Sequence, residues 1–119
     1  MTAGTAMPDP LPVEEVRTLA STSAAYEASH IAKASRGRVH AIYGYSTAAG
    51  FIQLHDSATL PADTAVPASF IACAANANWT FPIPADGQDC LNGITISTSS
   101  TGPTKTIGTA TAWFSVLYR

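Results

Sequence analysis

The stretch "TATAWFSVLYR", residues 109–119, decides which fold the sequence predicts. Every second position is apolar or aromatic, as in Ala110, Ala112, Phe114, Val116 and Tyr118. The positions between them hold Thr111, Trp113, Ser115 and Leu117. A repeat of two residues places the two sets on opposite faces of a β-strand. We therefore expect this segment to form a strand that packs one face against the core.

The same period of two begins upstream, at Gly37. In "GRVHAIYGYST", residues 37–47, it places one set of side chains on a common face, namely Val39, Ala41, Tyr43 and Tyr45. "FIQLHDS", residues 51–57, follows after Ala-Ala-Gly, a loop length typical of a β-hairpin. Further strands are expected in "SFIACAA" (69–75), "NWTFPI" (78–83) and "LNGITIST" (91–98).

Six or more short strands separated by Gly and Pro are typical of an antiparallel sandwich or barrel. With 119 residues, the chain is long enough for one hydrophobic core and no second domain. We predict an all-β fold, an antiparallel β-sandwich of jelly-roll-like form, over residues 37–119.

Residues 1–36 differ in composition, being rich in Ala, Ser, Thr and Pro. Pro8, Pro10 and Pro12 exclude a helix there and favour extended backbone. We expect residues 1–36 to form an extended N-terminal arm. Two local alternatives within it are a short helical turn at "VEEVRTLA" (13–20) and an edge strand at "AAYEASHIAKAS" (24–35).

Charge and hydropathy exclude several classes of partner. Only 12% of the residues are charged, about half the usual share, and the net charge is −2. Phosphate binding needs a basic surface, so we expect no direct nucleic-acid partner. The sequence contains no run of about 18 apolar residues that could span a membrane. "MTAGTAMPDPLP" lacks the charged and apolar regions of a secretory signal, so we expect synthesis in the cytoplasm.

The candidates for chemistry are few, and we expect no enzyme activity, metal or cofactor. His55 precedes Asp56, but neighbours on a strand point to opposite faces. The histidines and cysteines lack metal-ligand spacing, and "PADGQD" (84–89) reads as a turn and not as a calcium loop. Cys73 and Cys90 could form a disulfide, while a small buried hydrophobe is the reading we favour for Cys73.

Hydroxyl side chains dominate "STSSTGPTKT", residues 97–106. Gly102 and Pro103 indicate a turn, and we expect the hydroxyls beside it to stand on a solvated sheet face. Several aromatic side chains could stack on a sugar if they are not in the core, and Trp79 in "NANWTF" is the first candidate. Lys33, Arg36 and Arg38 form either a solvated junction or a docking site for an acidic partner.

Two long segments resemble a class of viral protein. They are "RVHAIYGYSTAAGFIQLHDSATLPADTAVP", residues 38–67, and "DCLNGITISTSSTGPTKTIGTATAWFSVLYR", residues 89–119. Together they resemble small β-sandwich virion proteins encoded beside structural genes in tailed bacteriophages. In these proteins a "FIQLHD"-like strand, an "LPADGAVP"-like loop and a "GI.I..SST.PTKT" segment recur in order. This chain has Thr64 where the resemblance leads us to expect Gly.

The resemblance implies a virion structural protein without catalytic residues. We expect a capsid decoration (cement) protein on the outer surface of a tailed-phage head, which it stabilises, with the major capsid protein as its partner. A tail- or fibre-associated virion protein and a carbohydrate-binding β-sandwich module are the alternatives.

The arm suits such a role, because a Pro-rich segment loses little entropy on docking. Since capsids offer three-fold positions, we also expect a homotrimer with exchanged arms. The expected partner-binding residues of the arm and junction are Leu11, Val13, Val16, Leu19, Tyr26, Lys33, Arg36 and Arg38.

Overall fold

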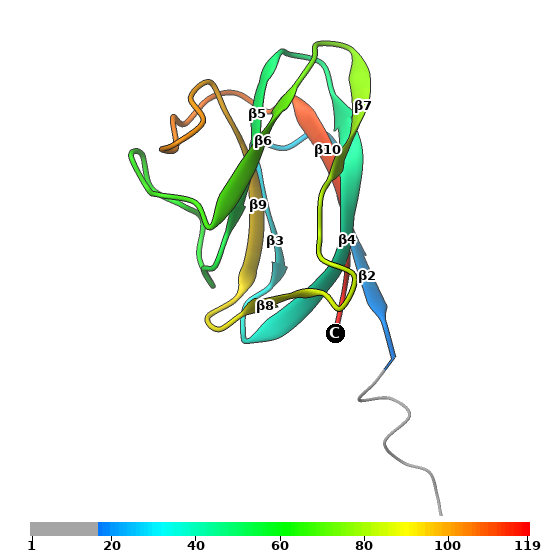
Figure 1. Ribbon diagram of the computed structural model, residues 1–119. Helices are drawn as coiled ribbons and strands as arrows, with labels where there is room; N and C mark the ends of the chain where they lie inside the picture. The colour runs from blue at the N-terminus through cyan, green and yellow to red at the C-terminus, as the bar shows by residue number, and fades with distance from the viewer. Residues whose placement is uncertain (1–16) are drawn as a thin grey trace, which may run out of the picture.

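The computed structural model describes residues 17–119, which form two antiparallel β-sheets packed face to face (Figure 1). The arm residues Leu11, Val13 and Val16 lie outside the described residues. Within residues 17–119 no helix has the length and apolarity needed to cross a membrane.

Each sheet takes strands from distant parts of the chain. The first, which we call the β10 sheet, has the order β2 (Leu19–Thr22), β10 (Ala112–Tyr118), β4 (Gly37–Ser46) and β7 (Ala77–Phe81), with β8 (Gln88–Cys90) also paired to β4. The second, the β9 sheet, has the order β3 (Ser29–Lys33), β9 (Ile94–Ser99), β5 (Gly50–His55) and β6 (Ser69–Cys73).

The strand pairs are nested like the two arms of one long hairpin. β2 pairs with β10, β3 with β9, β4 with β7 and β8, and β5 with β6. The hairpin is rolled up, so that β10 also pairs with β4 and β9 also pairs with β5. This nesting is a jelly roll. The predicted antiparallel sandwich of jelly-roll-like form is confirmed.

The expected boundary between arm and sandwich at residue 36 is wrong. β2 and β3 lie within the expected arm, yet their backbones pair with β10 and β9. The reason is that β2 and β3 form hydrogen-bonded ladders with the edges of β10 and β9 that would otherwise be unpaired. Of the local alternatives, the edge strand within residues 24–35 is confirmed as β3.

The expected hairpin between β4 and β5 is also wrong. Both sides of β4 are occupied, by β10 on one side and by β7 and β8 on the other. β5 therefore crosses to the opposite sheet, where it pairs with β9 and β6. The short connection after Ser46 is a corner between sheets.

The core is organised around Phe114, which is fully buried. The ring of Trp79 packs edge-to-face on that of Phe114, with 5.8 Å between centroids and an interplanar angle of 64°. Gly44 lies between them in the sheet, paired with Phe114 on one side and Trp79 on the other. A Cβ atom there would lie 1.9 Å from the carbonyl oxygen of Trp113 and 2.7 Å from the Trp79 ring. Only glycine leaves room for this close approach.

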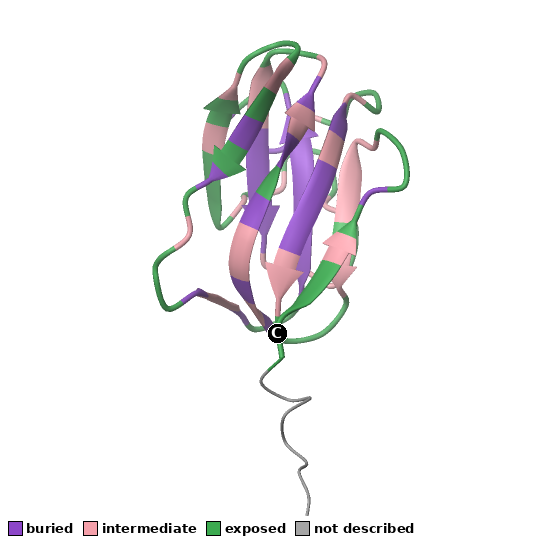
Figure 2. Cartoon of the chain, turned by 90° about the vertical axis from the view of Figure 1, so that its right-hand side faces the viewer, coloured by how far each residue is buried: buried purple, intermediate pink, exposed green. Residues whose placement is uncertain are grey.

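A β-bulge reverses the alternation expected for β4. Leu117 pairs with Ala41, but the next residue, Tyr118, pairs with Val39, so His40 is an extra residue in the strand. Val39 is buried as expected, whereas beyond the bulge Ile42 is the buried residue. Tyr43 and Tyr45 consequently face outward. The inner face predicted for β10 is confirmed for Ala112, Phe114 and Val116, which are buried in the core, although Ser115 on the opposite face is also buried. Figure 2 shows the buried residues concentrated on the central strands of the sandwich.

Substitutions of the adjacent residues Trp113 and Phe114 should have different effects on stability, because the two side chains lie on opposite faces of β10. We expect Phe114→Ala to lower the free energy of unfolding by about 3–5 kcal/mol, because it empties the centre of the core. Trp113→Ala should cost about 0.5–1 kcal/mol, because its half-exposed ring lies on the outer face. Urea unfolding of both variants measures the difference, and equal losses would contradict the assigned faces.

Candidate functional site

A cleft lined by aromatic side chains lies on the outer face of the β10 sheet. Tyr26, Tyr45 and Trp113 line it, together with Ala25. Trp113 and Tyr45 are directly opposite each other on β10 and β4, which places their Cβ atoms about 5 Å apart. The bridge between Glu27 and Ala112 holds the segment before β3 against β10, beside Trp113. We call this feature the aromatic cleft.

Polar but uncharged side chains surround the aromatic cleft. Asn78 pairs with Tyr45 and Thr80 pairs with Tyr43, and both are exposed on β7. On the other side, the hydroxyls of Thr22 and Ser115 are hydrogen-bonded at 3.2 Å. The described side chains on this part of the sheet therefore combine aromatic rings with amide and hydroxyl groups.

Trp79, the expected sugar-stacking residue, is wrong for that role. Its side chain is only 6% exposed and packs against Phe114, so no ligand can reach the face of the ring. The residue that the sequence could have indicated is Trp113, because the alternation of β10 already places it opposite the core face. The sequence pattern missed Tyr45, because the bulge in β4 reverses the alternation and turns this side chain outward.

The hydroxyl side chains of β9 are buried, so the expected solvated hydroxyl face is wrong for this strand, whereas Ser100, Thr101 and Thr104 in the turn are exposed. Every residue of β9 is buried, because the connections 56–68 and 100–111 fold over the outer face of the β9 sheet (Figure 1). The hydroxyl of Thr95 donates to the carbonyl of Ser57 at 2.8 Å. Ser99 Oγ accepts from the backbone N–H groups of Thr101 and Thr106, at 3.1 and 2.8 Å. These hydroxyls form hydrogen bonds with the backbone of the covering loops and are not exposed for contact with another molecule.

A buried polar network anchors the same loops. The amide nitrogen of Gln53 lies within 3.0 Å of three carbonyl oxygens of the 100–111 connection, those of Thr101, Gly102 and Thr104. Its Oε1 accepts a hydrogen bond from His55 Nε2 at 3.0 Å. Lys105 is 2% exposed, and its Nζ donates to the carbonyl of Thr98 at 2.5 Å.

The environment of this network shifts two pKa values. Burial and then the charge of Lys105 lower the pKa of His55 to about 4. Burial also lowers the pKa of Lys105, although the carboxylate of Asp63 raises it in part. His55 is therefore a neutral hydrogen-bond donor at pH 7. Its neighbour Asp56 points elsewhere and accepts from the backbone N–H groups of residues 91–93.

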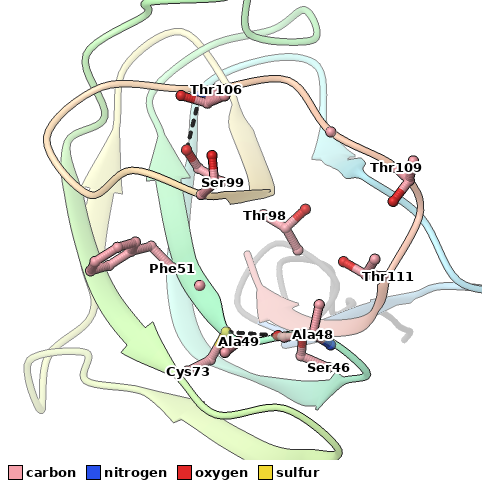
Figure 3. Close-up of a pocket in the computed structure, with 13 residues that line it drawn as sticks. Ser46, Ala48, Ala49, Phe51, Cys73, Thr98, Ser99, Thr106, Thr109 and Thr111 are labelled. Carbon is pink, nitrogen blue, oxygen red and sulfur yellow. Dashed lines mark hydrogen bonds between the residues drawn. The ribbon is translucent and has the colours of Figure 1, made fainter.

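A second pocket, of about 160 Å³, lies at the end of the sandwich where chain segments cross between the sheets (Figure 3). Hydroxyl side chains such as Ser46 and Ser99 line it, together with Phe51 and Cys73. The hydroxyl of Ser46 donates to the carbonyl of Ala48 at 2.7 Å, and Ser99 holds Thr106. These groups already have partners within the chain, so we assign this pocket to the packing of the corner.

The three cations of the expected junction have partners within the chain. Arg36 forms an ion pair with Asp89 at 2.9 Å, and Arg38 donates to the carbonyl of Asp86 at 2.8 Å. Lys33 donates to the carbonyl of Arg119 at 3.3 Å. Docking to an acidic partner at this junction stays a prediction. Of the expected arm residues that are described, Leu19 and Tyr26 are exposed.

Ser21, His30 and Glu27 form a hydrogen-bonded chain at one edge of the sandwich. Ser21 Oγ lies 2.8 Å from His30 Nε2, and His30 Nδ1 lies 2.8 Å from Glu27 Oε2. The order of groups is that of a serine hydrolase relay. However, Ser21 pairs with the buried Val116 and therefore faces the core, and the His30 ring is stacked on Phe114 with 6.3 Å between centroids. We interpret the trio as a tie between β2 and β3.

Metal and disulfide chemistry find little support within residues 17–119. No group of three or more His, Cys, Asp or Glu side chains in that range could hold a metal ion. Cys73 and Cys90 are free thiols. We expected Cys73 to be buried, but it is half-buried. Cys90 is the buried cysteine. Burial, together with the charges of Asp56 and Asp89, raises the pKa of the Cys90 thiol to about 11.

Acid should destabilise the protein through His55. The unfolded state binds a proton at the ordinary histidine pKa of 6.5, whereas the folded state binds it only at about 4. Stability is therefore lost as the pH falls from 6.5 to 4, by up to about 3 kcal/mol. We expect His55→Gln to remove this part of the pH dependence. Urea unfolding at several pH values measures it, and parallel curves for the wild type and the variant would refute the assignment.

The chain has no match among protein-family models, curated proteins or solved structures.

Proposed function

We propose that the protein is a non-enzymatic virion structural protein, a decoration (cement) protein that binds the outer surface of a tailed-phage head and stabilises it. The major capsid protein is its partner, and the capsid surface is its location. The observation that carries the proposal is a group of exposed apolar side chains on the two loops that cover the β9 sheet.

Three large apolar residues stand out on these loops. Leu60 is 60% exposed, Val66 is 77% exposed and Ile107 is 58% exposed. Leu60 and Ile107 line one groove, together with Pro61, Ala28, Ser29 and Lys105. Exposed apolar patches on small proteins commonly mark protein–protein contacts. We call these three residues the loop surface.

The loop surface is held rigidly, which favours docking. The backbone N–H of Thr64 donates to the carbonyl of Lys105 at 2.7 Å, and the N–H of Lys105 donates to the carbonyl of Ala65 at 2.7 Å. The N–H of Ile107 donates to the carboxylate of Asp63 at 3.0 Å. Because the two loops are already ordered, binding of a partner does not incur the entropic cost of ordering them.

Two further observations support a viral structural role. Jelly rolls are frequent in viral capsid proteins, although they also occur in lectins, so this is an argument from fold alone. Thr64 has a φ of 70°, a left-handed conformation that favours glycine. This is the position at which the resemblance to phage proteins leads us to expect Gly.

The position of β2 suits an arm that reaches a neighbour. Leu19 pairs with Tyr118, so the chain enters the sandwich beside its C-terminal strand. The first described residue, Arg17, therefore lies at the same end of the sandwich as the C-terminal end of β10. A homotrimer with exchanged arms is part of the proposal.

The loop surface should determine binding to phage heads. Heads of the encoding phage that lack this protein should take up purified wild type in hundreds of copies. Ile107→Asp should reduce the bound copies by about tenfold, because a charge in an apolar contact loses its hydration. Quantitative mass spectrometry of sedimented heads gives the copy number.

The matched control is Leu91→Asp, which changes an equally large side chain that is 61% exposed in the β8–β9 connection. It should bind as the wild type does. Equal binding by all three proteins would refute the role of the loop surface. A protein absent from purified particles would refute the proposal as a whole, and a handful of copies would indicate a tail or fibre component instead.

Removal of residues 2–16 tests the arm separately. This deletion takes away Leu11, Val13 and Val16 but leaves β2 intact. We expect the body to remain folded and to unfold cooperatively, although loss of the trimer lowers its thermal midpoint. The trimer should be lost and the number of bound copies on heads should fall, as measured by light scattering and sedimentation. Unchanged assembly and occupancy would exclude the arm mechanism.

A further inference from the structure

We propose that the aromatic cleft is a binding site for an uncharged saccharide. The site combines Tyr26, Tyr45 and Trp113 as stacking surfaces with neighbouring amide and hydroxyl groups. This inference goes beyond the decoration role and does not depend on it.

The stacking surface follows from the strand register. Trp113 and Tyr45 are cross-strand partners, so their rings emerge side by side from the same face of the sheet. Tyr26 adds a third ring from the segment that precedes β3, and Tyr43 is exposed two residues along β4 from Tyr45. Aromatic rings that carry one polar end bind ligands that have an apolar face and a polar edge, as the rings of sugars do.

Hydrogen-bonding groups lie at the edges of this surface. Asn78 is exposed beside Tyr45 and offers both a carbonyl acceptor and an amide donor. Thr80 is exposed beside Tyr43 and adds a hydroxyl group. The tyrosine hydroxyls themselves can donate or accept. A saccharide hydroxyl needs such mixed partners, since it is both a donor and an acceptor.

Charge and size argue against two other classes of ligand. A single-stranded nucleic acid also stacks on aromatic rings, but its binding groove must be positively charged, whereas the described lining of the aromatic cleft is uncharged. A stable protein–protein contact covers about 800 Å² on each partner. A shallow cleft lined by four residues is closer to the footprint of one or two sugar rings.

The test uses the purified full-length protein without phage particles, so its outcome is separate from that of the decoration proposal. The probes are uncharged oligosaccharides of glucose, galactose, mannose and N-acetylglucosamine on an array, with heparin and oligo-dT as charged probes. Binding is then followed by fluorescence, because the chain has two tryptophans and Trp113 is the more exposed one. We expect binding of at least one neutral oligosaccharide and a change in tryptophan emission.

Variants locate the site. Trp113→Ala should weaken binding by about tenfold or more, and Tyr26→Ala by several-fold, since each removes one stacking ring. Tyr26 precedes β3 and is exposed, so its loss should not affect folding. Phe70→Ala is the matched control, because it removes an exposed aromatic ring from the opposite sheet. Failure of all neutral probes, stronger binding to heparin or oligo-dT, or equal affinities of these variants would overturn the proposal.

Discussion

The position of β10 between β2 and β4 is the constraint on which the structure depends. A strand that pairs on both sides is removed from water along both edges, and its inner face holds Phe114 at the centre of the core. Because β2 is the first described strand and β10 the last, this pairing closes the roll and fixes which strands can be edges. It also explains why β4 cannot form a hairpin with β5. The aromatic cleft follows from the same register, since Trp113 is next to Phe114 and must face outward.

The outer faces of the two sheets differ in how far loops shield them from water. The β9 sheet is covered by its own loops. The side chains of Gln53, Thr95 and Ser99 beneath them are hydrogen-bonded within the chain, whereas the buried Ser97 Oγ has no partner among the described residues. Gln53 holds three loop carbonyls, and Lys105 extends from the loop to the carbonyl of Thr98. A buried amine is costly unless it is hydrogen-bonded. The β10 sheet has no such cover among the described residues near Trp113, and its outer face is polar and aromatic.

The sequence was sufficient where local periodicity decides the outcome and insufficient where distant segments decide it. The alternation around Phe114 predicted the strand and its faces correctly. In β4 one extra residue, His40, reversed the alternation, and no local signal reveals a bulge that the partner strand imposes. Trp113 alternates with the core residues Ala112 and Phe114, so the pattern already placed it on the outer face, whereas the burial of Trp79 was missed. Ser97 was expected to face solvent, because no local pattern shows that the connections 56–68 and 100–111 fold back over β9.

The proposed docking surface and the proposed saccharide cleft lie on opposite sheets of one sandwich. The loop surface covers the β9 sheet, whereas the aromatic cleft opens on the β10 sheet, so contact at one leaves the other free. A docked copy would therefore present its aromatic cleft away from the shell. A shallow site of three rings binds a single sugar weakly, but many copies on a regular lattice raise the combined affinity by several orders of magnitude when their spacing matches that of a repetitive glycan. The arrangement thus suits a protein whose overall binding affinity comes from many copies acting together and does not require a deep pocket.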